Sequence, residues 1–74
     1  MSNFPTVTGA QLVKALRKLG FEVIRIKGSH HFLQHSDGRC TVVPVHRSET
    51  LGRGLFAQIL HDCDLSREEL QKYL

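Results

Sequence analysis

The sequence predicts an α+β fold, in which a three-stranded antiparallel sheet carries helices on one face in the order α-β-β-β-α-α. Two observations lead to this prediction. A well-capped amphipathic helix opens the chain, and a run of β-forming residues broken by glycine turns follows it. Two short helical segments complete the pattern. At 74 residues the chain is expected to form one domain over residues 1–74, with a thin core.

The first helix is predicted to begin after Thr8 and to end at Gly20. Thr8 and Gln11 match the T-x-x-Q capping box, in which each side chain satisfies a backbone amide of the other residue. Glycine favours the left-handed conformation that ends many helices. The apolar positions at helical spacing are Leu12, Ala15, Leu16 and Leu19, and the basic positions off this stripe are Lys14, Arg17 and Lys18. We therefore expect a helix that is basic on its solvent side.

Three strands are predicted after this helix, and together they form a meander. Gly28 ends the first strand, and the Asp-Gly pair inside the turn Ser36–Arg39 is a strong hairpin signal. Pro44 cannot donate a hydrogen bond to a neighbouring strand, so it belongs at an edge or near the end of a strand. The predicted strands are Phe21–Lys27, His30–His35 and Cys40–Val45.

The C-terminal third is predicted to hold a polar loop and two short helices. The loop covers residues 46–53, and glycines at positions 52 and 54 introduce the second helix. Ser66 and Glu69 form an S-x-x-E capping box for the last helix, with Leu65 and Leu70 at the positions of a hydrophobic staple. The apolar face of the second helix consists of Leu55, Phe56, Ile59 and Leu60. The last helix is expected to lie over one end of the core.

The charge is compatible with a nucleic-acid partner, and the cysteine content argues against a disulfide-stabilised secreted protein. The net charge is +3, and it divides into +5 over residues 1–61 (eight basic, three acidic) and −2 over residues 62–74 (two basic, four acidic). A basic surface suits a nucleic-acid partner, although it serves solubility equally well. Residues 1–5 do not resemble a secretion signal, so the cytoplasm is the expected location. Cys40 and Cys63 are too few for a disulfide scaffold and are expected to be reduced core residues.

The most unusual segment is residues 27–35, which contains three of the five histidines. His31 and His35 are four residues apart, which on a strand is about 13 Å. Zinc bonds are about 2 Å long, so these two rings cannot share one ion. His30 points to the opposite side of the strand from His31. The sequence therefore predicts neither a metal site nor a cofactor.

Acid–base chemistry on RNA is the alternative use of these histidines. A histidine can take the proton of an RNA 2′-hydroxyl, whose oxygen then attacks the adjacent phosphate. This reaction requires no metal, because the nucleophile belongs to the substrate. Ser29 and the amides around Gly28 can donate hydrogen bonds to the phosphate, while Arg25, Lys27 and Arg47 can supply positive charge. The other interpretation is that the histidines are surface residues of a strand without any chemical role.

The direction in which side chains of the middle strand point indicates which of the adjacent residues His30 and His31 is the reactive histidine. If Phe32 is a core residue, His30 and Gln34 lie on its face because side chains alternate along a strand. His31 and Leu33 then lie on the other face, which solvent or substrate can reach. This argument favours His31 as the reactive group and makes His30 a packing or orienting partner.

Several blocks along the chain resemble the HicA (YcfA-like) family of toxins from prokaryotic toxin–antitoxin pairs. The resemblance extends from about Gly9 to Leu70, and G-S-x-H followed by V-P-x-H is its most specific feature. The blocks are Leu19-Gly20-Phe21, Lys27-Gly28-Ser29-His30-His31-Phe32, Asp37-Gly38-Arg39, Val43-Pro44-Val45-His46, Gly54…Ile59-Leu60 and Leu65-Ser66-Arg67-Glu68-Glu69. One departure is Gly54-Leu55-Phe56, which lacks a capping hydroxyl at the start of the second helix.

The resemblance implies a fold like that of double-stranded-RNA-binding domains and the activity of an mRNA endonuclease, inhibited by a HicB antitoxin. The family's catalytic histidine in G-S-x-H corresponds to His31, with Gly28, Ser29 and His30 as supporting positions. Two other functions stay open, namely a non-catalytic RNA-binding module and an inactive protein-interaction domain held by an antitoxin. The expected RNA contacts are Lys27, Arg25, Lys14 and Arg47, and the candidates for a second proton-transfer group are His35 and His46.

Overall fold

The structure is a computed structural model that describes residues 6–74, so the N-terminal residues that argued against a secretion signal lie outside the described part. Its elements are α1 (Gly9–Lys18), β1 (Phe21–Lys27), β2 (His30–His35), β3 (Cys40–Pro44), α2 (Arg53–Cys63) and α3 (Arg67–Gln71). The strands form one antiparallel sheet in the order β1-β2-β3. The predicted α+β class and element order are confirmed.

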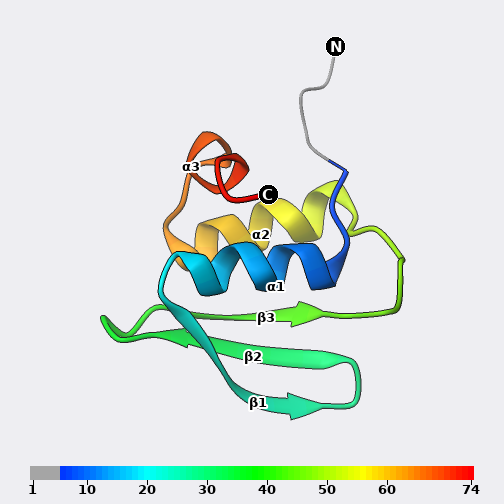
Figure 1. Ribbon diagram of the computed structural model, residues 1–74, viewed down its shortest axis with the longest axis horizontal. Coiled ribbons are helices and arrows are strands. Elements are labelled where there is room, and N and C mark those ends of the chain that lie inside the picture. Colours follow the sequence, from blue (N-terminus) through cyan, green and yellow to red (C-terminus); the bar gives the residue numbers. More distant parts are fainter. Residues whose placement is uncertain (1–5) are drawn as a thin grey trace.

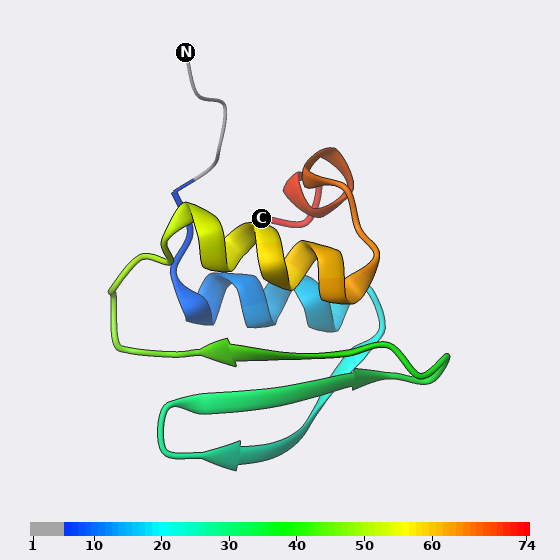
Figure 2. The same ribbon diagram turned by 180° about the vertical axis from the view of Figure 1, so that it is seen from behind.

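The elements are arranged in layers. Helices α1 and α2 lie side by side over one face of the sheet, and α3 lies beyond them, on the side away from the sheet (Figures 1 and 2). Within residues 6–74, no helix covers the opposite face of the sheet. No helix in this part of the chain is long and apolar enough to cross a membrane.

Both ends of α1 follow the sequence prediction. The Thr8 hydroxyl accepts a hydrogen bond from the Gln11 amide at 3.1 Å, and the Gln11 side chain accepts one from the Thr8 amide at 2.9 Å. Gly20 has φ +101°, a left-handed conformation that a residue with a Cβ rarely adopts. A Cβ at this position would also lie 2.8 Å from Nε2 of His35. Gly20 therefore ends the helix and makes room for the β2 side chain.

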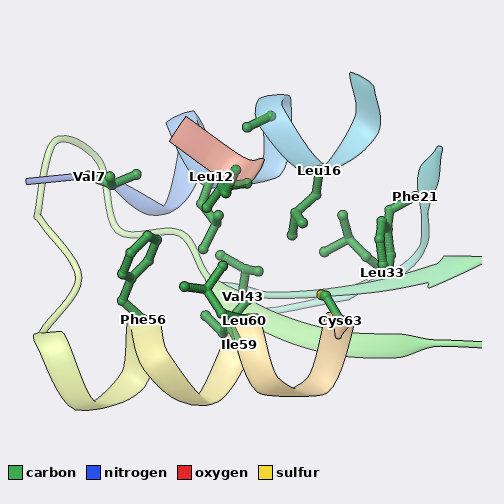
Figure 3. Close-up of a cluster of buried hydrophobic side chains, with 12 residues drawn as sticks. Val7, Leu12, Leu16, Phe21, Leu33, Val43, Phe56, Ile59, Leu60 and Cys63 are labelled. Atoms are coloured by element: carbon green, nitrogen blue, oxygen red, sulfur yellow. The ribbon is translucent and has the colours of Figure 1, made fainter. Parts of the chain in front are cut away.

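The core lies between the sheet and the two large helices, and α3 closes one side of it (Figure 3). Its side chains are at most 7% exposed, and they come from the segment before α1 and from all six elements. The core residues are Val7, Leu12, Ala15, Leu16, Phe21, Leu33, Val43, Phe56, Ile59, Leu60, Cys63 and Leu70. Burial of Leu70 agrees with the staple predicted for the last helix.

The predicted facing of β2 is wrong. Leu33 is fully buried on the helix-covered face, whereas Phe32 is half-buried on the uncovered face, beside Arg25 of β1 and Val42 of β3. Alternation along the strand separates Phe32 from Leu33, but both are apolar, so the pattern cannot say which of them meets the helices. The guanidinium of Arg25 lies 5.8 Å from the centre of the Phe32 ring and partly covers it.

The two cysteines differ in burial, so the prediction that both belong to the core is correct only for Cys63. Cys63 is fully buried at the end of α2, and burial raises the pKa of its thiol to about 11. Cys40 is exposed because it pairs with Gln34 on the uncovered face. Strand β3 ends at Pro44, one residue earlier than predicted, although the Val45 amide still donates to the Ser29 carbonyl in register with the β2–β3 pairing.

The ends of the last two helices also follow local sequence signals. Gly52 precedes α2 without a side-chain capping bond, and the helix begins at Arg53, so Leu55, where the hydroxyl was expected to be missing, lies inside the first turn and not at the cap. Ser66 and Glu69 form the predicted capping box of α3, with the two bonds at 3.0 and 2.9 Å. The Ser66 amide, donating to the Glu69 carboxylate, holds the pKa of Glu69 below its usual value.

Candidate active site

The turn between β1 and β2 is made by Gly28 and Ser29. Gly28 has φ +60°, and Ser29 is not among the residues with positive φ. Positive φ at the first central position alone is the pattern of a type II′ turn, which is common in two-residue hairpins and requires glycine there. The turn sets Lys27 opposite His30 and starts β2 one residue before His31.

The carbonyl oxygen of Ser29 joins this turn to the rest of the molecule. It accepts a hydrogen bond from the Val45 amide at 2.7 Å, and Nδ1 of His31 lies 3.3 Å from it. A carbonyl oxygen can only accept, so Nδ1 of His31 carries the proton in this contact. In the neutral ring, Nε2 is then left with a free lone pair.

His31 lies on the helix-covered face, at a corner where the helix layer ends. It is half-buried, and its neighbours across the sheet are Ile26 of β1 and Val43 of β3. Val43 is fully buried, but Ile26 is 59% exposed, so the helices do not extend over β1 here. The facing argument therefore assigned His31 to the wrong face, but this corner of the covered face is open to solvent.

Three segments meet at this end of the molecule, on the right in Figure 1: the turn 28–29, the start of α1 and the loop after β3. A Cβ at Gly9 would overlap the carbonyl of Pro44, so glycine is required for this close approach. Thr8 forms an isolated bridge with Thr50, and the Leu51 amide donates to the Val7 carbonyl at 2.8 Å. The loop is thus attached at both ends.

A comparison with protein-family models matches residues 9–65 to the family described as "HicA toxin of bacterial toxin-antitoxin". The match covers well over half of the chain and includes the whole G-S-x-H segment, residues 28–31. The chain belongs to the HicA toxin family. It is therefore a toxin component whose partner is an antitoxin. A search of curated proteins finds no match.

The four basic residues predicted to bind RNA do not form one surface in this HicA-family chain. Lys27 and Arg25 project from the uncovered face, where they pair with His30 and Phe32. Arg47 lies in the loop after β3, two residues beyond Val45, whose amide donates to the Ser29 carbonyl of the turn, and it has φ +47°. Lys14 is separate from the other three basic residues, because it lines a hollow beside the C-terminal residues Gln71, Tyr73 and Leu74. Lys27 and Arg47 are thus the cations placed at the His31 end of the sheet.

The other histidines of the HicA motif region occupy different environments. His30 is exposed on the uncovered face, so it does not pack beside His31 as expected. His35 is on the face of His31 but about 13 Å along the strand, where its ring contacts Phe21 at a centroid distance of 5.1 Å. The Asp37 amide donates to Nδ1 of His35 at 3.2 Å. His35 thus has a structural environment, whereas His46 is exposed in the loop near the turn 28–29.

Proposed function

We propose that this HicA-family toxin is a metal-independent endoribonuclease that cleaves mRNA and so inhibits translation and growth. The observation that carries the proposal is the contact between Nδ1 of His31 and the Ser29 carbonyl. It leaves Nε2 free, and the exposed Ile26 beside the ring marks an open corner. A free imidazole nitrogen at a solvent-accessible corner is what general acid–base catalysis on RNA requires.

The proposed reaction begins with the 2′-hydroxyl of the RNA. Nε2 of His31 takes the hydroxyl proton, and the oxygen attacks the adjacent phosphorus as the bond to the 5′-oxygen breaks. The leaving 5′-oxygen receives a proton, so the products are a 2′,3′-cyclic phosphate and a 5′-hydroxyl end. We choose His46 as the second proton-transfer group, because the preceding residue, Val45, donates to the same Ser29 carbonyl that His31 contacts. In the alternative arrangement, His46 takes the 2′-hydroxyl proton and His31 gives a proton to the leaving 5′-oxygen.

RNA binding is assigned to positive charge around the turn. We assign phosphate contacts to Lys27, at the end of β1 before the turn, and to Arg47, in the loop after β3, and the amides of Gly28 and Ser29 can donate to phosphate oxygens. Arg25 and Lys14 lie farther away and would contact more distant parts of the strand. Phosphate contacts do not read bases, so we expect loose sequence preference. A HicB-like antitoxin in the cytoplasm is the proposed natural inhibitor.

The test is cleavage of a defined RNA by purified protein in the presence of EDTA. His31→Ala should slow cleavage about a hundredfold or more, because positioned acid–base groups contribute this much. Circular dichroism should show an unchanged fold. His61→Ala is the matched control, because His61 is exposed on α2, outside the candidate site.

Two results would contradict the proposal. One is cleavage by His31→Ala at the wild-type rate. The other is RNA that is bound, with an affinity that falls steeply with salt, but stays intact; this second result would indicate a non-catalytic RNA-binding module.

A further inference from the structure

The uncovered face of the sheet carries three rows of side chains, defined by the pairing of the strands. Each row takes one residue from β1, one from β2 and one from β3. The rows are Glu22–Gln34–Cys40, Arg25–Phe32–Val42 and Lys27–His30–Pro44. The middle row combines a cation with two apolar side chains, and a polar row lies on each side of it.

A β-bulge adds an aliphatic side chain to this face. The register of β1 against β2 shifts between Val23 and Arg25, so Ile24 is the extra residue. The extra residue of a bulge shares its cross-strand partner with the next residue, so Ile24 lies opposite Phe32 together with Arg25, on the uncovered face. In agreement, Ile24 lines one hollow with Phe32 and Val42 and another with Glu22 and Gln34. Ile26, two residues later, pairs with His31 and therefore lies on the other face. The bulge thus separates two isoleucines that regular alternation would put together.

Ile24, Phe32 and Val42 form an exposed apolar cluster, which we call the sheet patch. Ile24 is 59% exposed, Val42 is 38% exposed and Phe32 is half-buried. A chain of 74 residues has a thin core and few apolar side chains to fill it. Three apolar side chains that lie together on an exposed sheet therefore do not contribute to that core. Contiguous exposed apolar patches on small proteins indicate binding surfaces.

Positive charge borders the sheet patch on the β1 side. Arg25 lies over the Phe32 ring, and Lys27 follows it in the next row. Glu22 is the acidic residue in the rows of this face. Asp62 also lines the hollow, but its two carboxylate oxygens already accept hydrogen bonds from Thr41 and Gln58. The face therefore complements a partner with apolar side chains next to acidic ones.

We propose that the sheet patch is a docking surface for the antitoxin, which presents an apolar segment flanked by acidic side chains. This inference rests on the toxin–antitoxin family to which the chain belongs, and not on RNA cleavage. The free edge of β1 lies beside the patch, so an antitoxin can extend past the sheet and contact more than the patch alone.

A second copy of this chain fits the patch less well. Three strands of about six residues present a flat area of roughly 20 by 14 Å, which is about 300 Å². Stable interfaces bury about 800 Å² from each partner. Two copies would also bring together surfaces of the same sign, because each has Arg25 and Lys27 beside the patch.

RNA is also a poor match for the centre of the patch. Proteins that bind single strands stack bases on several aromatic rings. The centre of this patch has one ring, Phe32, between two aliphatic side chains, Ile24 and Val42. Aliphatic side chains offer a base neither a stacking plane nor a hydrogen bond, whereas they fit the apolar side chains of a protein.

The test is the affinity of the full chain for the purified product of the adjacent gene, measured by calorimetry. Ile24→Glu with Val42→Glu should weaken binding about a hundredfold, because two aliphatic contacts are lost and negative charge is added. Ile26→Glu is the matched control, since Ile26 has the same residue type, strand and exposure of 59% but lies on the other face. It should change affinity no more than about threefold, a change of under 1 kcal/mol.

The outcomes are distinguishable from those of the cleavage test. If the double variant cleaves RNA like the wild type but binds the antitoxin weakly, the proposal is supported. Equal affinity of the double variant and the Ile26→Glu control would overturn it, as would an adjacent-gene product that does not bind the wild type. A dimer of the wild type that the double variant breaks would assign the patch to self-association. A loss of RNA affinity alone would assign it to RNA.

Discussion

At the scale of single residues, the Ser29 carbonyl controls which nitrogen of His31 is available. The same oxygen accepts from the Val45 amide at 2.7 Å, so its position is also held by the segment that follows the neighbouring strand β3. An oriented carbonyl selects the ring tautomer, just as the groups hydrogen-bonded to a metal-bound histidine fix the tautomer of that ring. His31 therefore takes its orientation from a backbone contact, and no side chain is needed for this purpose.

This contact predicts the protonation pattern of the His31 ring. In ¹⁵N NMR spectra recorded at alkaline pH, where imidazole is neutral, His31 should carry its proton mainly on Nδ1. His30 serves as the comparison, because its ring makes no hydrogen bond with the described residues. A spectrum in which His31 carries its proton on Nε2 would contradict the orientation that the structure shows.

At the level of elements, strand β2 contributes side chains to both faces of the sheet, and the two faces have different surroundings. One of its faces contributes Leu33 to the core and His31 to the candidate site, and the other contributes Phe32 to the sheet patch. The adjacent apolar residues Phe32 and Leu33 thus lie in different environments, Leu33 in the core and Phe32 on the proposed docking surface. The role of each follows from the layer that covers it and not from its hydrophobicity.

The difference between the two faces of β2 predicts two stability changes. Leu33→Ala should lower the free energy of unfolding by about 3 kcal/mol, because it leaves a cavity in the core. Phe32→Ala should lower it by about 1 kcal/mol, since the half-buried ring mainly loses its contact with Arg25. Urea unfolding of the two variants measures both values, and a larger loss for Phe32→Ala would show that the facing is wrong.

At the scale of the whole molecule, Arg39 connects the second hairpin to the helix layer. Its guanidinium donates to the carbonyl of Cys63 at the end of α2 and to the carboxylate of Asp37, and it lies 5.2 Å from the centre of the Phe21 ring. Next to it, the Thr41 hydroxyl donates to Asp62 at 3.0 Å. These bonds hold the C-terminal end of α2 against the sheet, where free carbonyls require donors.

Arg39→Ala should therefore destabilise the fold even though the residue is partly exposed. We expect a loss of about 2 kcal/mol, because a charge-assisted hydrogen bond to a helix end and the packing of the stem are removed together. Lys14→Ala on the exposed side of α1 should change stability by less than about 0.5 kcal/mol. Chemical unfolding of both variants tests this, and equal stabilities would mean that Arg39 does not connect the layers.

The helices and strands of this protein, and most of their ends, can be predicted from local sequence signals. Capping boxes at Thr8 and Ser66 and the glycine at position 20 act within a few residues, so their effects are visible in the chain. The G-S-x-H segment likewise indicated the family, which the match over residues 9–65 establishes.

Which face of β2 is buried, and with it the environments of His31 and Phe32, depends on packing between distant parts of the chain. Alternation along a strand divides side chains into two sets, but long-range packing against α1 and α2 selects the set that is covered. The bulge at Ile24 and the meeting of Ser29 with Val45 depend in the same way on pairing between distant segments. Contacts of this kind carry no local signal, because each partner lies in a different part of the chain.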